Sequence, residues 1–439
     1  MIVENKIKTI NSKARNLILV LFFILLAMLI TLKVLFNYFS LIIFFILLFI
    51  FVFILGKLFV ISNFRNVGFK NGIQVIFLYF NLEKELVDAG IYFKRKLINI
   101  NDYSLLVSLP SYKFSFDSDF ETGVLKIRNS IKFNEKFLNL NLDSALGEFI
   151  SDYKYFSDDN CYLIINLINI NCNRKFYFDS ILDMKKEIQK NKNYRYSFVI
   201  DKRLNVPFSN ILLNGQTGSG KTYFLYNIII QLLWSNSMVY IIDPKNSSLA
   251  QIGKLMNGKY SAIYPEDIYR VIKDFRNLME IRKEEISYKL KEGLNLNYFD
   301  FNYEAAYLII DEFATVKGFL DVESQDVKKQ VWADINAIVT QGRSLGFFVC
   351  FSLQKTDSNI LSLLIRDNLQ LKIVMGSSDI TTYLTAFGME FDLKGKQVKT
   401  GEGFYKGMGM TEPRKMYAPE LNFDIYNLCE KLIALNKYK

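Results

Sequence analysis

The chain of 439 residues contains no histidine and only four cysteines. The absence of histidine excludes histidine metal ligation and every acid–base mechanism that uses an imidazole. The cysteines form no CxxC pair, which argues against a zinc site and indicates reduced, packed thiols in a reducing compartment. They are Cys161, Cys172, Cys350 and Cys429.

Positive charge exceeds negative charge, with 54 lysines and arginines against 44 aspartates and glutamates and a formal net charge of +10. This balance suits an anionic partner, but diffuse basicity often serves solubility alone. Part of the excess also lies beside the apolar N-terminal segments, where it reports topology. Charge by itself therefore identifies no partner.

The most informative segment is GQTGSGKT, which matches the phosphate-binding pattern GxxxxGK[ST]. It lies between an apolar run at 210–213 and a helical segment that starts near residue 221, as such a loop requires. Its residues are Gly215, Gln216, Thr217, Gly218, Ser219, Gly220, Lys221 and Thr222. The pattern predicts an ATP-binding loop.

Each residue type in this loop has a physical reason to be there. The glycines let the backbone wrap closely round phosphates with its N–H groups turned inward. Lys221 can reach the β- and γ-phosphates, Thr222 can give its hydroxyl to Mg²⁺, and the following helix presents its positive end to the anion.

A second motif supplies carboxylates. The unbroken apolar run at 306–310 is typical of a strand buried in a parallel sheet, and it ends in Asp311 and Glu312. We expect Asp311 to hold the Mg²⁺ shell and Glu312 to polarise the attacking water, which favours hydrolysis over phosphoryl transfer to a small acceptor.

Two further predicted strands complete the pattern. Residues 238–242 end in Asp243-Pro244-Lys245, and residues 347–353 end in Gln354, whose amide could sense the γ-phosphate. Ligands of doubly wound sheets collect at the carboxyl ends of strands. The expected fold is therefore α/β.

The order GQTGSGKT, IIDPK at 241–245, YLIIDEFA at 307–314 and QGRSLGFFVCFSLQK at 341–355 resembles the motor domain of FtsK/SpoIIIE-type DNA translocases. The resemblance covers roughly residues 195 to 425. It implies a RecA-like P-loop ATPase that forms a homo-hexameric ring and moves DNA, with Gln354 as the sensor glutamine. One departure is Ser352-Leu353-Gln354, where the family usually has Ala-Thr-Gln.

The resemblance also implies a position for an arginine finger, a cation that one subunit presents to its neighbour's phosphate. Arg343, in the Gly-Arg-x-x-Gly segment before the 347–353 strand, is the first candidate for this catalytic role. It could equally cap its own helix. Arg366 is the second candidate.

Two apolar runs, at 17–32 and 41–55, predict a transmembrane hairpin. Basic residues precede the first run and follow the second, whereas the connection at 37–40 is uncharged. The positive-inside rule then places both termini and the ATPase domain in the cytoplasm, with the chain as a multi-pass protein of the cell membrane.

We expect four parts: a basic cytoplasmic N-terminus at 1–16, the hairpin at 17–60, an intermediate α+β domain at 61–195 and the FtsK-like motor at 196–439. In the intermediate domain the patterns favour strands at 103–110, 112–116, 124–131 and 161–170, and a helix at 136–153. No catalytic constellation is found there.

The sequence shows no winged-helix module after the motor, unlike the chromosome-segregating members of the family. With only two membrane helices, the chain looks most like the short coupling ATPases of Gram-positive conjugative elements. That resemblance implies relaxase and transfer-channel proteins as partners. Three alternatives stay open: a segregation translocase, a protein-secretion ATPase of FtsK type, and a scaffold that binds nucleotide without hydrolysing it.

Overall fold

The computed structural model describes most of the chain in two separate units, residues 1–173 and 174–439. The described residues are 7–9, 20–28, 38–61, 64–95, 105–138, 140, 142, 144–256, 258–289, 297–355, 359–391, 398–410 and 412–435. The division falls near residue 173, whereas the sequence placed the end of the intermediate domain at residue 195.

The first unit begins with apolar helical segments. Residues 20–28 are helical, and α2 (Tyr38–Ile61) is a helix of 24 residues. Across the residues that the structure describes, no helix is both long enough and apolar enough to cross a membrane. Several large side chains of α2, Phe45, Phe49 and Phe53 among them, are exposed.

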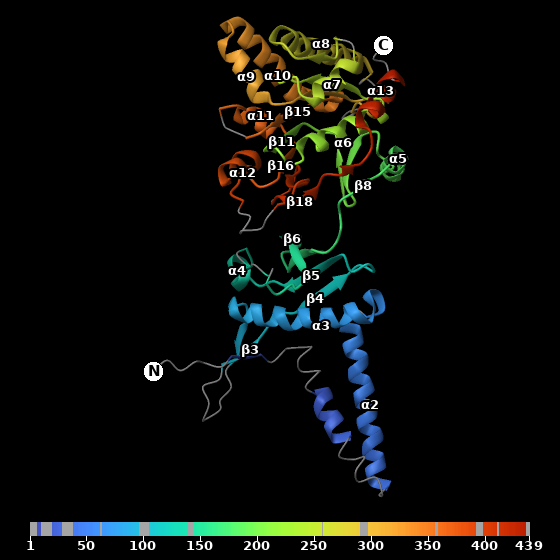
Figure 1. The fold of residues 1–439 in the computed structure, drawn as a ribbon. Helices are drawn as coiled ribbons and strands as arrows, with labels where there is room; N and C mark the ends of the chain where they lie inside the picture. The colour runs from blue at the N-terminus through green and yellow to red at the C-terminus, as the bar shows by residue number, and fades with distance from the viewer. Residues whose placement is uncertain are drawn as a thin grey trace. The chain divides into compact units, whose positions relative to one another are not determined.

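The core of this unit is a four-stranded antiparallel sheet in the order β4-β5-β7-β6 (Figure 1). Its strands are β4 (Tyr112–Phe116), β5 (Thr122–Arg128), β6 (Phe149–Phe156) and β7 (Tyr162–Asn169). Helix α3 (Phe64–Asp88) packs on one face, and its buried side chains join those of the strands in one apolar cluster. A short α4 (Asn134–Leu138) and a sheet of β1 (Ile7–Thr9), β3 (Leu105–Ser108) and β2 (Phe93–Arg95) complete the unit.

The prediction of a helix at 136–153 is wrong. The helix ends at Leu138, and strand β6 starts at Phe149. Gly147 lies between them with φ of 60°, a left-handed conformation that an α-helix does not contain. Apolar residues at near-helical spacing misled the prediction, because Leu140, Leu142 and Leu146 are buried from irregular backbone.

The segment at 174–195 belongs to the second unit. Strand β8 (Tyr177–Phe178) pairs in parallel with β19 (Glu420–Leu421), near the end of the chain. Helix α5 (Ile181–Lys190) follows, with a side-chain cap from Ser180 and with Met184 and Ile188 buried. The last described helix, α13 (Ile425–Leu435), starts four residues after β19.

An eight-stranded sheet forms the second unit, in the order β13-β12-β14-β15-β11-β16-β17-β18. The first six strands of that order are parallel, and the last two are antiparallel. They are β13 (Ser261–Ala262), β12 (Met238–Ile242), β14 (Ala306–Ile310), β15 (Phe347–Leu353), β11 (Ile211–Gly215), β16 (Leu371–Met375), β17 (Glu402–Lys406) and β18 (Arg414–Tyr417). The predicted α/β class is confirmed.

Helices cover both faces of this sheet (Figure 1). One face carries α5, α6 (Lys221–Trp234), α7 (Ser248–Leu255) and α13. The other carries α8 (Pro265–Lys289), α9 (Phe313–Val322), α10 (Gln325–Leu345), α11 (Leu363–Asp367) and α12 (Ile380–Phe387). Successive residues of a strand enter opposite cores: Leu212 packs in one cluster and its neighbours Ile211 and Leu213 in the other.

A hairpin of β9 (Ser197–Asp201) and β10 (Leu204–Pro207) precedes the phosphate-binding strand. Strand β17 forms the first arm of a hairpin with β18.

A buried ion pair joins the start of the second unit to its sheet. The Arg174 guanidinium donates to both carboxylate oxygens of Asp201, at 3.2 and 3.1 Å, and both side chains are almost fully buried. Asp201 also accepts from the backbone N–H groups of Arg203 and Tyr417. Burial raises the pKa of Asp201, and the charge of Arg174 opposes that shift. The carboxylate therefore depends on its partner.

Arg174→Met should destabilise the second unit strongly, because it leaves a buried carboxylate without its counter-ion. Loss of one partner of a buried pair costs about 3–5 kcal/mol. The matched control is Lys175→Met, which breaks a more exposed pair with Glu420 and should cost at most about 1 kcal/mol. Urea unfolding of both variants measures the difference, and equal losses would contradict a special role for the Arg174–Asp201 pair.

Candidate functional site

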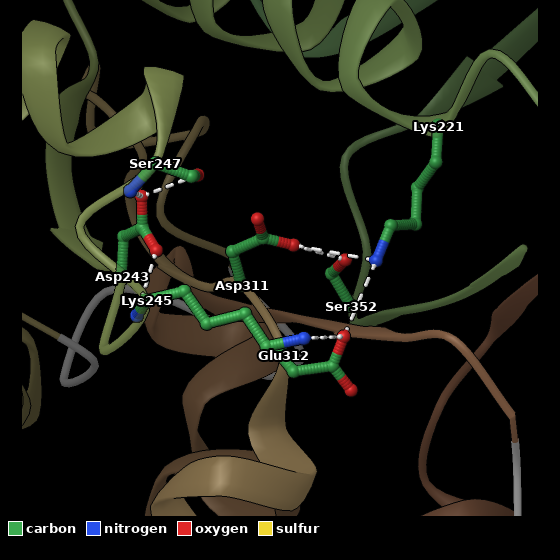
Figure 2. A network of polar contacts seen from close by, with 7 residues as sticks. All are labelled: Lys221, Asp243, Lys245, Ser247, Asp311, Glu312 and Ser352. Carbon is green, nitrogen blue, oxygen red and sulfur yellow. Dashed lines mark hydrogen bonds and ion pairs between the residues drawn. The ribbon is translucent and has the colours of Figure 1, made fainter. Parts of the chain in front are cut away.

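The parallel strands bring the predicted site residues to one edge of the sheet. The phosphate-binding strand β11 and the carboxylate strand β14 are not neighbours, because β15 lies between them. The carboxyl ends of β12, β14, β15 and β11 therefore line up in that order. Figure 2 shows side chains from all four strand ends meeting in one polar network.

The phosphate loop has the backbone that its glycines allow. Gly218 and Gly220 take φ of 83° and 96°, and Gly220 caps helix α6, which begins at Lys221. A Cβ on Gly220 would lie 2.9 Å from the backbone nitrogen of Gly401. That N–H donates to the Ser219 carbonyl at 2.9 Å. The loop therefore packs against the start of β17, and a side chain at position 220 would break the contact.

Lys221 lies between the two acidic residues. Its Nζ is 3.5 Å from Asp311 Oδ1 and 4.0 Å from Glu312 Oε2, and all three side chains are largely buried. The structure thus brings together the lysine and both carboxylates that the sequence selected. In a partly buried site these charges interact more strongly than on an open surface.

Asp311 is held from the neighbouring strand. Ser352 Oγ, fully buried at the end of β15, donates to Asp311 Oδ1 at 2.6 Å. The sequence treated Ser352 only as a departure from the family pattern. Its position two residues before Gln354, on the strand next to β14, is the signal that could have identified it. Ser352 fixes the orientation of one proposed Mg²⁺ ligand.

Glu312 has an unusual backbone and a second cation. Its φ of 52° is left-handed, which is strained for a residue with a side chain, and it occupies the N-cap of α9. Its carboxylate is almost buried and accepts from Lys245 Nζ at 3.2 Å. Lys245 was noted in the Asp-Pro-Lys motif but was not selected as a site residue.

A buried aspartate shapes the loop that carries Lys245. Asp243 accepts from the backbone N–H groups of Lys245, Ser247 and Ala250 at 3.2, 2.8 and 2.9 Å, and from the Ser247 hydroxyl at 2.7 Å. These bonds close a tight turn after β12 and direct Lys245 toward Glu312 (Figure 2). Asp243 therefore acts on the site through the backbone.

Three predicted residues lie outside this network. Gln354 directly follows β15 at the same edge and is exposed. Arg343 is in the last turn of α10, before β15, and therefore at the opposite edge; the seven residues of β15 span ~23 Å. Its Nη1 contacts Met408 Sδ at 3.6 Å. Arg366 donates to the Thr385 carbonyl at the end of α12, which gives it a structural contact.

The arrangement fits a nucleotide with its cation. The loop offers inward-turned backbone and a helix N-terminus for phosphates. Thr222, in the first turn of α6, and Asp311 supply the oxygen ligands that Mg²⁺ prefers, and phosphate oxygens and water would complete its shell. In the described part of the chain, no three acidic or cysteine side chains form a metal site of their own.

Comparison with known proteins supports the resemblance. No protein-family model matches the chain. The FtsK domain-containing protein YdcQ of Bacillus subtilis (strain 168) is 24% identical over 293 residues, which are 66% of this chain and 57% of the relative. The resemblance to FtsK/SpoIIIE-type ATPases is thus confirmed, and the chain spans little more than half of that relative's length.

Two solved structures are also similar. The pCW3 conjugation coupling protein TcpA, in its monomer form with ATPγS, has a TM-score of 0.49 and 16% identity, over 74% of this chain and 93% of that chain. The cytoplasmic domain of the type VII secretion ATPase EccC of Thermomonospora curvata has a TM-score of 0.41 and 15% identity, over 54% of this chain and 31% of that chain.

The positions of Lys221 and Glu312 predict separable defects. Lys221→Ala should lose nucleotide binding by at least about tenfold, because it removes the charge that faces the phosphates. Glu312→Gln should bind ATP normally and lose at least about a hundredfold in turnover, since an amide cannot accept the proton of water. Calorimetric binding and phosphate release measure the two effects. Normal turnover by Glu312→Gln would contradict its catalytic assignment.

Proposed function

We propose that this protein is a membrane-anchored, hexameric, Mg²⁺- and ATP-dependent DNA translocase that serves as a coupling protein in conjugative transfer. The ATPase part rests on the meeting of Lys221, Asp311 and Glu312 at one sheet edge. Lys221 Nζ lies 3.5 Å from Asp311 Oδ1 and 4.0 Å from Glu312 Oε2. DNA movement, the hexamer and conjugation rest on the resemblance to FtsK/SpoIIIE-type ATPases.

In the proposed reaction the chain's own residues have distinct tasks. Lys221 and the loop backbone orient the phosphates, and Asp311 is held by Ser352 to face the cation. Bound Mg²⁺ would neutralise charge that develops on the phosphate oxygens. Glu312, placed next to Lys221 on a strained backbone, would take a proton from the attacking water, and Gln354 would report the γ-phosphate.

Membrane anchoring is supported by the N-terminal sequence and by α2. The apolar runs at 17–32 and 41–55, with basic flanks and an uncharged connection, favour a hairpin with both termini in the cytoplasm. Large apolar side chains of α2 are exposed along its length, as a surface that meets lipid would be. The motor would then work on the side of the membrane where ATP is available.

DNA should stimulate ATP hydrolysis by the full chain purified in detergent. Phosphate-backbone contacts release counterions, so the stimulation should fall about tenfold or more between ~50 and ~200 mM salt and depend little on base sequence. Glu312→Gln is the matched control that separates stimulated turnover from contaminating activity.

The same assay distinguishes the main alternative. A protein-secretion ATPase would ignore DNA and respond to a polypeptide cargo. Rates that stay flat with duplex and single-stranded DNA at low salt, in a preparation shown to be hexameric, would exclude the DNA-translocase function and favour secretion.

Arg343 would act on the site of a neighbouring subunit, because in its own subunit it lies at the far edge of the sheet. Its guanidinium is exposed, which a contact in trans requires. Titrating Arg343→Ala subunits into wild-type protein should lower ATPase activity more steeply than dilution, since each variant disables a neighbour. Arg270→Ala, at an exposed arginine on α8, should leave the activity unchanged at every mixing ratio. A linear decline for Arg343→Ala would return Arg343 to a structural role.

A further inference from the structure

Helix α3 has two apolar faces, and within the described part of the chain only one of them is buried. Val75, Leu78, Leu82 and Leu86 are buried against the four-stranded sheet, so this face belongs to the core of the first unit. A hydrogen bond also joins the helix to the sheet, because the Tyr112 hydroxyl of β4 donates to buried Glu83. The orientation of α3 on the sheet is therefore fixed.

The opposite face of α3 carries large apolar side chains that are exposed. Phe69, Ile73 and Phe77 recur every four residues, which places them in one row along the helix. They are 76%, 38% and 61% exposed. A row of exposed apolar side chains on a protein surface marks a site of contact with a membrane or with another molecule.

The charges beside the row itself, between residues 64 and 82, are basic. From residue 64 to residue 82 the sequence contains no aspartate or glutamate, and its basic residues are Arg65 and Lys70. Both are exposed, and so is Lys84 further along the helix, where half-buried Glu85 and exposed Asp88 lie nearby. Lysine beside exposed phenylalanine is the composition of a helix that lies in a lipid interface, where the long side chains reach phosphate headgroups.

The chain also places this face close to apolar α2. Helix α2 ends at Ile61, and α3 begins at Phe64, with only two residues between the elements. Gly68, with φ of 80° and ψ of 173°, interrupts the helical backbone at the start of α3 and changes its direction. The exposed row starts immediately after this break.

We infer that the exposed face of α3 lies in the headgroup region of an anionic membrane leaflet, with Phe69, Ile73 and Phe77 inserted and Lys70 and Lys84 at lipid phosphates. This inference rests on the membrane anchoring proposed above. The sheet packed on the opposite side of α3 then faces away from the lipid. Because α3 is fixed to that sheet, the first unit takes a defined orientation toward the membrane.

Fluorescence quenching by brominated lipid tests this placement in the full chain. Phe77→Trp introduces an indole into the row, and wild-type protein, with two tryptophans, gives the background. In phosphatidylcholine vesicles with ~30% phosphatidylglycerol, the added emission should fall by about half when the upper acyl chains are brominated. Tyr155→Trp, on the exposed part of β6 in the same unit, is the matched control and should keep its emission.

The outcomes separate the inference from the proposed function. Flotation of the protein with vesicles tests anchoring, and quenching tests α3. Flotation without quenching of Phe77→Trp overturns the inference and leaves anchoring intact. The inference also fails if the added indole emits at a shorter wavelength in detergent-solubilised oligomers but is not quenched in vesicles, because that result marks a contact between copies. Failure to float overturns both.

Charge supplies a second measurement that does not depend on tryptophan. Lys70→Glu/Lys84→Glu should weaken the quenching of Phe77→Trp at least about threefold in anionic vesicles, because anionic headgroups attract the lysines and repel the glutamates. The double variant should change little in neutral vesicles. Equal quenching of the two proteins in anionic vesicles would contradict the headgroup contacts.

Discussion

The ammonium group of Lys221 is the charge around which the site is organised. It stands within 4.0 Å of two carboxylates that come from another strand, and neither carboxylate is free to move away. Ser352 holds Asp311, and Lys245 holds Glu312. Two ammonium groups therefore balance two carboxylates in a partly buried space, where an unpaired charge would be costly. A nucleotide that enters this space brings negative charge and a cation, so every one of these ion pairs must adjust.

The Asp-Pro-Lys loop links this adjustment to the position of Glu312. Asp243 uses four hydrogen bonds to hold the turn, and the turn presents Lys245 to Glu312. Glu312 is strained at φ of 52°, which such packing and pairing can maintain. The proposed general base is thus paired with a residue from the end of β12, a strand that β14 and β15 separate from β11 in the sheet. A change at the loop of β12 would reach the catalytic carboxylate through one ion pair.

The sequence predicted the parts of the fold that follow from local rules. Buried parallel strands are continuous apolar runs, so the strands that end at Asp243, Asp311 and Gln354 were visible, and the phosphate loop follows from its glycines. It did not reveal that β15 separates β11 from β14, because strand order is set by long-range pairing. For the same reason Ser352 was missed as the partner of Asp311. The prediction of a helix at 136–153 failed because the leucines at near-helical spacing are buried from irregular backbone, which includes Gly147 in a left-handed conformation.

Arg343 lies far from the phosphate-binding loop of its own subunit. The fold places it before β15 while the phosphates are expected after β11, so no side-chain motion within one subunit can bring it to its own site. The glycines on either side of it have a local explanation, because a Cβ on Gly342 would meet the Phe347 carbonyl at 2.3 Å and Gly346 ends the helix at φ of 77°. The glycines therefore serve the helix–strand turn, and the arginine does not need them. The guanidinium of Arg343 is exposed and contacts Met408 Sδ at 3.6 Å, and the proposed contact with a neighbouring subunit requires this exposure.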